Sequence, residues 1–184
     1  MKRKIILVAF AVTSLIFSST QAFALFSFSA GVPISQSFTG KDSSGGKIES
    51  DGVSGVFLHA SLPILVGLGV ENYKTKLKGG GSVELATTMY DIFYLLPIPI
   101  INLTLGLGAG TTKRQCTGCP ATYDKGKPTQ WYASIGVPVP IFPFFDMHLS
   151  YRSLSSKMKI KTAAGGGEVD FSGNVTGVGI MFSF

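Results

Sequence analysis

The chain has little charge. Asp, Glu, Lys and Arg make up 14% of its 184 residues, against 45% hydrophobic residues and 23 glycines. A soluble domain averages about 25% charged residues. Either the surface of the folded protein is apolar, or little of that surface is in water.

Long apolar runs are also missing beyond the N-terminus. A transmembrane helix needs about 20 consecutive apolar residues, and the best candidate, Ile92 to Gly110, is broken by Pro97 and Pro99. Its last part alternates through Gly106 and Gly108, which is poor helix material. The stretch therefore predicts two strands joined by a proline turn. Without helices, only a closed barrel satisfies the backbone inside a membrane.

The N-terminus has the three-part pattern of a secretory signal peptide. Lys2, Arg3 and Lys4 precede an apolar run, residues 5–16, that is too short to span a bilayer, and "SSTQAFA" then ends at Ala24. We predict a signal peptide, residues 1–24, cleaved after Ala24; a membrane-anchor helix is the alternative. We expect residues 25–184 to form one domain. Removing the three bases takes the net charge from +6 to +3.

Cysteine is scarce: the chain has two, Cys116 and Cys119, in "CTGC". In an oxidising compartment this pair predicts a disulfide that staples a loop. A zinc site needs four ligands, and no histidine is near in sequence. A thioredoxin-like site needs the motif to open a helix. Free thiols, a metal site and a redox site remain the alternatives, and we expect no cofactor and no metal.

What the chain does contain is eight segments whose apolar residues recur at every second position, as in strands. They are Leu25–Phe38, Gly52–Leu62, Leu65–Leu77, Val83–Leu96, Ile101–Lys113, Thr129–Val137, Phe144–Ser155 and Val169–Phe184. Their connections alternate between short proline turns such as "LPI" and long polar loops such as "TGKDSSGGKIESDG" and "SSKMKIKTAAGGGE". Short turns at one end and long loops at the other are typical of bacterial outer-membrane barrels.

The C-terminal stretch "VTGVGIMFSF" adds a separate signal. Ile180 and Phe182 alternate toward the terminal Phe184, which resembles the outer-membrane signature read by the barrel-assembly machinery. With the signal peptide and the eight segments, the chain resembles the small eight-stranded OmpA-like and OmpX-like barrels. The resemblance implies an all-β, antiparallel, up-and-down transmembrane barrel in the bacterial outer membrane, surrounded by lipid and lipopolysaccharide. We expect a monomer.

The stretch "FPFFDMHLSYRS" predicts which residues face which side. Its alternation directs Phe145, Met147, Leu149 and Tyr151 to lipid, and Asp146, His148, Ser150 and Arg152 into the barrel. The same phasing predicts a polar network that plugs the interior, formed by His59, Glu71, Asp91, Asp146, His148 and Arg152. Arg152 needs an acidic partner, since an unpaired buried charge is costly. Asp146, Asp91 and Glu71 are the candidates.

Basic residues gather in and beside the long loops. We predict that six of them ring the barrel above its apolar band and contact lipopolysaccharide phosphates: Lys74, Lys76, Lys78, Lys157, Lys159 and Lys161. Basic clusters beside anionic head groups gain about 1 kcal/mol per base. The alternative is a merely solvated rim, because lysine also keeps exposed strands soluble. The small excess charge favours no nucleic-acid partner.

An enzyme is the rival interpretation. "HLS" resembles the motif of lipid A deacylases, which are also eight-stranded barrels, and it would use His148, Ser150 and an acid such as Glu71 or Asp146. The family's asparagine after the serine is replaced by Tyr151, and its catalytic face opens to lipid, whereas His148 and Ser150 are predicted to face inward. We therefore predict a non-catalytic barrel. A soluble lipocalin-like barrel or sandwich, with its apolar residues inside, is a third possibility.

Overall fold

We describe the protein from a computed structural model. The described residues are 26–42, 45–62, 66–79, 83–98, 101–116, 122–123, 125–140, 142–162 and 165–183. Within them, no helix is long and apolar enough to cross a membrane. The predicted signal peptide and the terminal Phe184 lie outside the described residues, so the signal peptide and the role of Phe184 in assembly stay predictions.

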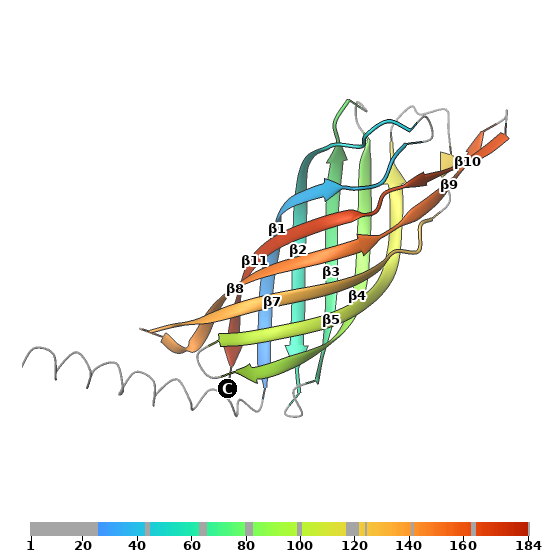
Figure 1. Cartoon of the computed structure of the whole chain (residues 1–184). Helices are drawn as coiled ribbons and strands as arrows, with labels where there is room; N and C mark the ends of the chain where they lie inside the picture. Colours follow the sequence, from blue (N-terminus) through green and yellow to red (C-terminus); the bar gives the residue numbers. More distant parts are fainter. Residues whose placement is uncertain are drawn as a thin grey trace, which may run out of the picture.

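The chain forms a closed barrel of eight antiparallel strands (Figure 1). The barrel strands are β1 (Ser27–Phe38), β2 (Ser50–Ser61), β3 (Val66–Leu77), β4 (Glu84–Ile98), β5 (Ile101–Gln115), β7 (Thr129–Val139), β8 (Phe142–Ser155) and β11 (Gly173–Ser183). Each strand pairs with the next barrel strand along the chain, and β1 pairs with β11 to close the ring. This confirms the predicted all-β, up-and-down barrel.

The short connections meet at one end of the barrel. Ile98 of β4 pairs with Ile101 of β5, and the β2–β3 turn is closed by the amide of Leu62, which donates to the carbonyl of Val66. The ladder between β1 and β11 begins at the same end with Ser27 opposite Ser183. The long connections lie at the other end, as the alternation of connection types predicts.

A second, three-stranded sheet lies beyond the long-loop end. It consists of β6 (Thr122–Tyr123), β9 (Lys157–Thr162) and β10 (Gly165–Asp170), in the order β10-β9-β6. Figure 1 shows β9 and β10 extending away from the barrel. We expected a polar loop here and a last strand that begins at Val169; instead β9 and β10 are strands, and the last barrel strand begins at Gly173.

Side-chain hydrogen bonds mark the junction between the barrel and the projecting sheet. Ser156, between β8 and β9, donates its amide to Oγ of Ser172, and Ser172 donates its amide to a carboxylate oxygen of Asp170. The amide of Phe171 also donates to the carbonyl of Ser156, so side-chain and backbone bonds together hold the junction. The junction is also held by an apolar cluster, formed by Phe38, Ile48, Leu85, Met158, Val169 and Phe171.

The wall is irregular at one seam. β1 pairs with β2 only over Ser27–Gly31, although both strands are 12 residues long. Along its other edge, β1 shifts register between Pro33 and Ser35 as it follows β11. Proline has no amide to donate to a ladder. The outer half of β1 therefore follows β11 rather than β2.

Candidate functional site

A band of exposed apolar side chains surrounds the barrel wall, and every barrel strand contributes to it. One member from each strand in turn is Phe28, Leu58, Leu68, Ile92, Leu107, Ile135, Leu149 and Val178. Their neighbours in sequence point inward, so the predicted outward face is confirmed, including Met147, Leu149 and Tyr151 on β8.

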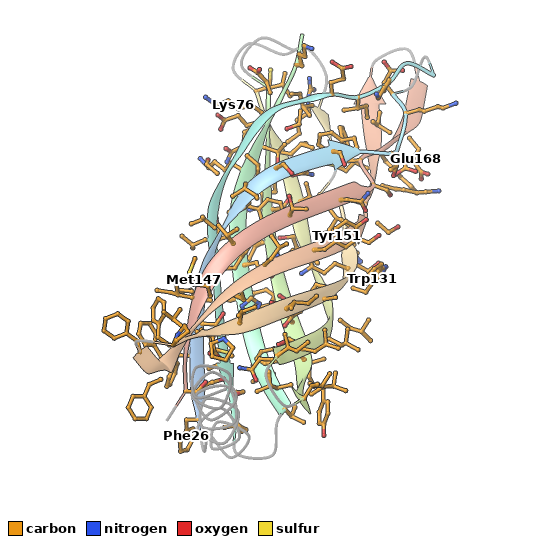
Figure 2. All side chains as sticks on the ribbon, turned by 60° about the vertical axis from the view of Figure 1, so that its left-hand side comes forward. Phe26, Lys76, Trp131, Met147, Tyr151 and Glu168 are labelled. Atoms are coloured by element: carbon orange, nitrogen blue, oxygen red, sulfur yellow. The ribbon has the colours of Figure 1, made fainter. Side chains whose placement is uncertain are left out.

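Aromatic side chains mark both edges of this band. Trp131 and Tyr151 pack together toward the long loops, with ring centroids 5.8 Å apart. Phe145 and Phe182 pack at 5.2 Å toward the short turns. Figure 2 shows Phe26 at the short-turn end and Lys76 at the opposite end, with Trp131 and Tyr151 between them.

The centre of the interior holds a buried ion pair. Nε of Arg152 donates to Oε1 of Glu71 at 2.7 Å, and the two side chains are only 1% and 0% exposed. Of the three acidic partners considered from the sequence, Glu71 is therefore the one that binds Arg152. The guanidinium carbon of Arg152 also lies 3.6 Å from the centre of the Phe57 ring, a cation–π contact.

Gln130 and His59 join this pair to a second carboxylate. The amide of Gln130 donates both to Glu71, at 3.0 Å, and to Asp91, at 2.7 Å. Nε2 of His59 lies 3.3 Å from Glu71 and 3.9 Å from Asp91. Gln130 is not among the six residues predicted to form the polar network. We call His59, Glu71, Asp91, Gln130 and Arg152 the ion cluster.

The other predicted members of the polar network lie outside the ion cluster. Asp146 accepts a 2.5 Å hydrogen bond from Asn102, and Nδ1 of His148 is 3.1 Å from the hydroxyl of Ser134. The structure thus brings together four of the six predicted residues and gives the remaining two, Asp146 and His148, partners of their own.

Glycines on neighbouring strands make room for these large side chains. In the ladders, Gly69 is opposite His59, Gly108 is opposite Asp91 and Gly179 is opposite His148. A Cβ at Gly108 would collide with the Asp91 carboxylate, and one at Gly179 with the His148 ring. An eight-stranded barrel is only just wide enough for its side chains. The alternating glycines of β5 are therefore part of the site.

An apolar layer fills the interior beyond the ion cluster. It consists of Phe57, Tyr73, Met89, Leu154 and Val175, with Val53 packed against it. Each of the five is at most 4% exposed. In the ladders, Phe57 and Met89 lie opposite Glu71, and Val175 lies opposite Arg152, so the apolar layer packs directly against the ion cluster. We call the interior on the short-turn side of this layer the polar half; the alternation of the sequence did not reveal this arrangement.

A small cavity lies in the polar half, with a volume of about 30 Å³. Its lining includes His59, Tyr132, Ser134, His148 and Arg152. The Tyr132 hydroxyl and Nε2 of His148 have no hydrogen-bond partner among the described residues. The space suffices for about two water molecules, which would provide those bonds.

The geometry of His148 and Ser150 differs from that of a base and its nucleophile. Ser150 donates to the carbonyl of Gly177 at 3.1 Å and accepts from Arg152 at 2.7 Å, whereas His148 contacts Ser134. A serine nucleophile needs its base within hydrogen-bonding distance. Both side chains also face the interior, away from the apolar wall.

The ion cluster contains the side chains best placed to hold a metal among the described residues. Ligand atoms of His59, Glu71 and Asp91 lie within 4.8 Å of one another. However, Nε of Arg152 already donates to Oε1 of Glu71, and a guanidinium beside a divalent cation would be repelled. The arrangement fits an ion-pair network better than a metal centre.

The predicted rim lysines are exposed wherever their side chains are described. Lys74 and Lys76 lie on β3, and Lys78 follows it. Lys157 and Lys159 lie on β9, where exposed and buried residues alternate in phase with those of β8, so they continue the outward face of β8 into the projecting sheet. The side chain of Lys161 lies outside the described residues.

Two of these lysines already have acidic partners. Lys78 binds Glu49 at 2.9 Å, and Lys157 binds Glu168 at 3.5 Å. The hydrogen bond from Lys78 holds the pKa of the Glu49 carboxyl below its usual value, and the same bond raises the pKa of Lys78. The predicted disulfide cannot be placed here, because Cys119 lies outside the described residues; it stays a prediction.

Comparisons with known proteins support the fold. No protein-family model matches the sequence, and no curated protein matches it. Among solved structures, the outer membrane protein OprG from Pseudomonas aeruginosa matches with a TM-score of 0.56 and 13% identity, over 89% of this chain and 98% of OprG. Neisserial surface protein A matches with a TM-score of 0.57 and 14% identity, over 86% of this chain and 97% of its own. The chain has the eight-stranded barrel fold of these two proteins.

Proposed function

We propose that the protein is an integral, non-catalytic barrel of the bacterial outer membrane, and that its basic outer rim contacts lipopolysaccharide. The proposal rests on one observation: apolar side chains cover the outside of the barrel, and charged side chains lie inside it. Leu68 and Leu149 on the wall are 65% and 59% exposed, while Glu71 and Arg152 are buried inside. A barrel with water outside would have the opposite arrangement, so lipid is the solvent that suits this wall.

The proposed orientation has the short turns toward the periplasm and the long loops outside, as in bacterial barrels generally. The filled interior supports a role without wide conductance, because the ion cluster and the apolar layer both occupy its cross-section. Envelope stabilisation, adhesion and recognition at the cell surface all suit such a barrel. In this proposal Phe184, Phe182 and Ile180 serve assembly, and Cys116 and Cys119 staple an outer loop.

The rival function, hydrolysis of lipid A acyl chains by His148 and Ser150, is tested directly by mass spectrometry of lipid A. Cells expressing the intact protein are compared with cells expressing His148→Ala, with both proteins recovered from the outer-membrane fraction. We expect identical lipid A. Loss of an acyl chain only with the intact protein would establish the enzyme and contradict the non-catalytic proposal.

A further inference from the structure

A pair of lysines faces outward from the wall of β3, β4 and β5. In the ladders, Lys74 of β3 is opposite Ala86 of β4, and Ala86 is opposite Lys113 of β5. Neighbouring strands are about 4.8 Å apart, so the lysine backbones are about 10 Å apart across one small residue. Both lysines are exposed. Their flexible side chains can therefore meet the same anion above Ala86.

No ion pair neutralises these two lysines within the described part of the chain. The salt bridges there that use lysines are those of Lys78 with Glu49 and Lys157 with Glu168. Residues that lie opposite one another on the outward face form a row. In the next row toward the loops, Lys76 lies opposite Glu84. The pair at Lys74 and Lys113 therefore offers two positive charges on one face of the wall to an external anion.

The wall below the pair changes from polar to apolar. The next row consists of Asn72, Thr88 and Thr111, and the amide of Asn72 donates to the hydroxyl of Thr88 at 3.1 Å. Lower on the same wall lies an apolar groove, whose outward side chains are Val66, Ile92, Tyr94, Leu105, Leu107 and Trp131. From rim to groove, the wall thus presents cations, then hydrogen-bonding groups, then hydrocarbon.

We propose that this wall binds one phosphorylated, acylated glycolipid of the outer leaflet, the lipid A portion of lipopolysaccharide. Its phosphate contacts Lys74 and Lys113 above Ala86, its sugar contacts the row of Asn72, Thr88 and Thr111, and an acyl chain lies in the groove beside Trp131. The inference rests on the proposed outer-membrane location, and it assigns the contact to a defined site rather than to the whole rim.

The position of Trp131 provides the measurement. It is the only tryptophan of the chain, and its side chain is 49% exposed in the groove. Figure 2 shows it on the wall, well below the rim marked by Lys76. Bisphosphorylated lipid A carrying brominated acyl chains, titrated into the protein in detergent micelles, would quench Trp131 fluorescence on binding. The same lipid without its phosphates is the ligand control.

The decisive comparison is between two double variants that remove the same charge. We expect Lys74→Ala with Lys113→Ala to weaken binding about 25-fold, since each base near an anionic head group contributes about fivefold. Lys157→Ala with Lys159→Ala, on the projecting β9, should change it less than about twofold. Removing the phosphates from the lipid should abolish the difference. Folding of each variant is verified by its gel mobility before and after boiling.

Two results would overturn the site. Equal weakening by both double variants would mean that the rim acts as a diffuse charge, so the proposed lipopolysaccharide contact would stand without this site. Binding unchanged by either variant would remove the site and the lysine contact together. As a second variant, Ala86→Glu places a carboxylate between the lysines and should weaken binding about as much as the double substitution, without deleting either lysine.

Discussion

The ion cluster and the apolar layer fill the barrel interior with different chemistry. Toward the short turns, Arg152 and Glu71 form a buried ion pair within a network of hydrogen bonds. Against this pair, Met89, Val175 and their neighbours pack as an apolar layer. An ion pair must be complete to be tolerated, because one charge left alone in the interior is costly. The apolar layer has no such requirement, because shortening one of its side chains leaves a cavity rather than an unpaired charge.

The largest expected effect is at the ion pair. Glu71→Gln leaves Arg152 buried without its acid, and it should lower the free energy of unfolding by about 3–5 kcal/mol. Urea titration in phosphatidylcholine vesicles, followed by Trp131 fluorescence, measures this. Adding Arg152→Met to the same chain should restore most of the loss, because no unpaired charge then remains. A double variant less stable than Glu71→Gln alone would show that the loss does not come from an unpaired Arg152.

The apolar layer should respond to lost volume. Met89 is 0% exposed, so Met89→Ala should lower the free energy of unfolding by about 3 kcal/mol. The matched control is Met147→Ala on the outer wall, where Met147 is 60% exposed and a change of about 0.5 kcal/mol is expected. Equal losses at the two methionines would mean that the wall residue is packed against protein.

Alternation in the sequence revealed the barrel but not the filling of its interior. Period-two patterning and connection length sufficed to predict the eight strands, and the phasing directed Glu71, Asp91 and Arg152 inward. Which acid binds Arg152 depends on how far each strand is staggered against its neighbours, and Glu71 is 81 residues away in the chain. Local pattern carries no such information. Strands β9 and β10 are not among the eight predicted segments, because glycine-rich "AAGGGE" is typical of loops.

Gly108 on β5 tests how tightly the ion cluster is packed. Gly108→Ala would drive a methyl group into the Asp91 carboxylate and separate it from Gln130, and it should lower the free energy of unfolding by about 1–3 kcal/mol. Gly167→Ala on β10 is the control, since nothing lies within 4 Å of its Cβ position. The two variants are compared in the same urea titration. A neutral Gly108→Ala would show that the ion cluster has room to shift.

The smallest expected effect is at the edge of the polar half. Ser134→Ala removes the hydroxyl that contacts Nδ1 of His148, and it should lower the free energy of unfolding by about 1 kcal/mol. Lipid A in cells expressing this variant should be unchanged. A variant that altered lipid A would instead give His148 a role in chemistry.

The central claim is that lipid surrounds a wall whose inner face is filled by protein. Ile135 and Ser134 test it as neighbours on β7, because Ile135 is 52% exposed and Ser134 is 6% exposed. Each is replaced by a spin-labelled cysteine in a chain carrying Cys116→Ser and Cys119→Ser, reconstituted in liposomes. The account predicts that the label at Ile135 collides with oxygen and not with a water-soluble nickel chelate, while the label at Ser134 is shielded from oxygen. Frequent nickel collisions at Ile135 would place the wall in water and contradict the membrane barrel.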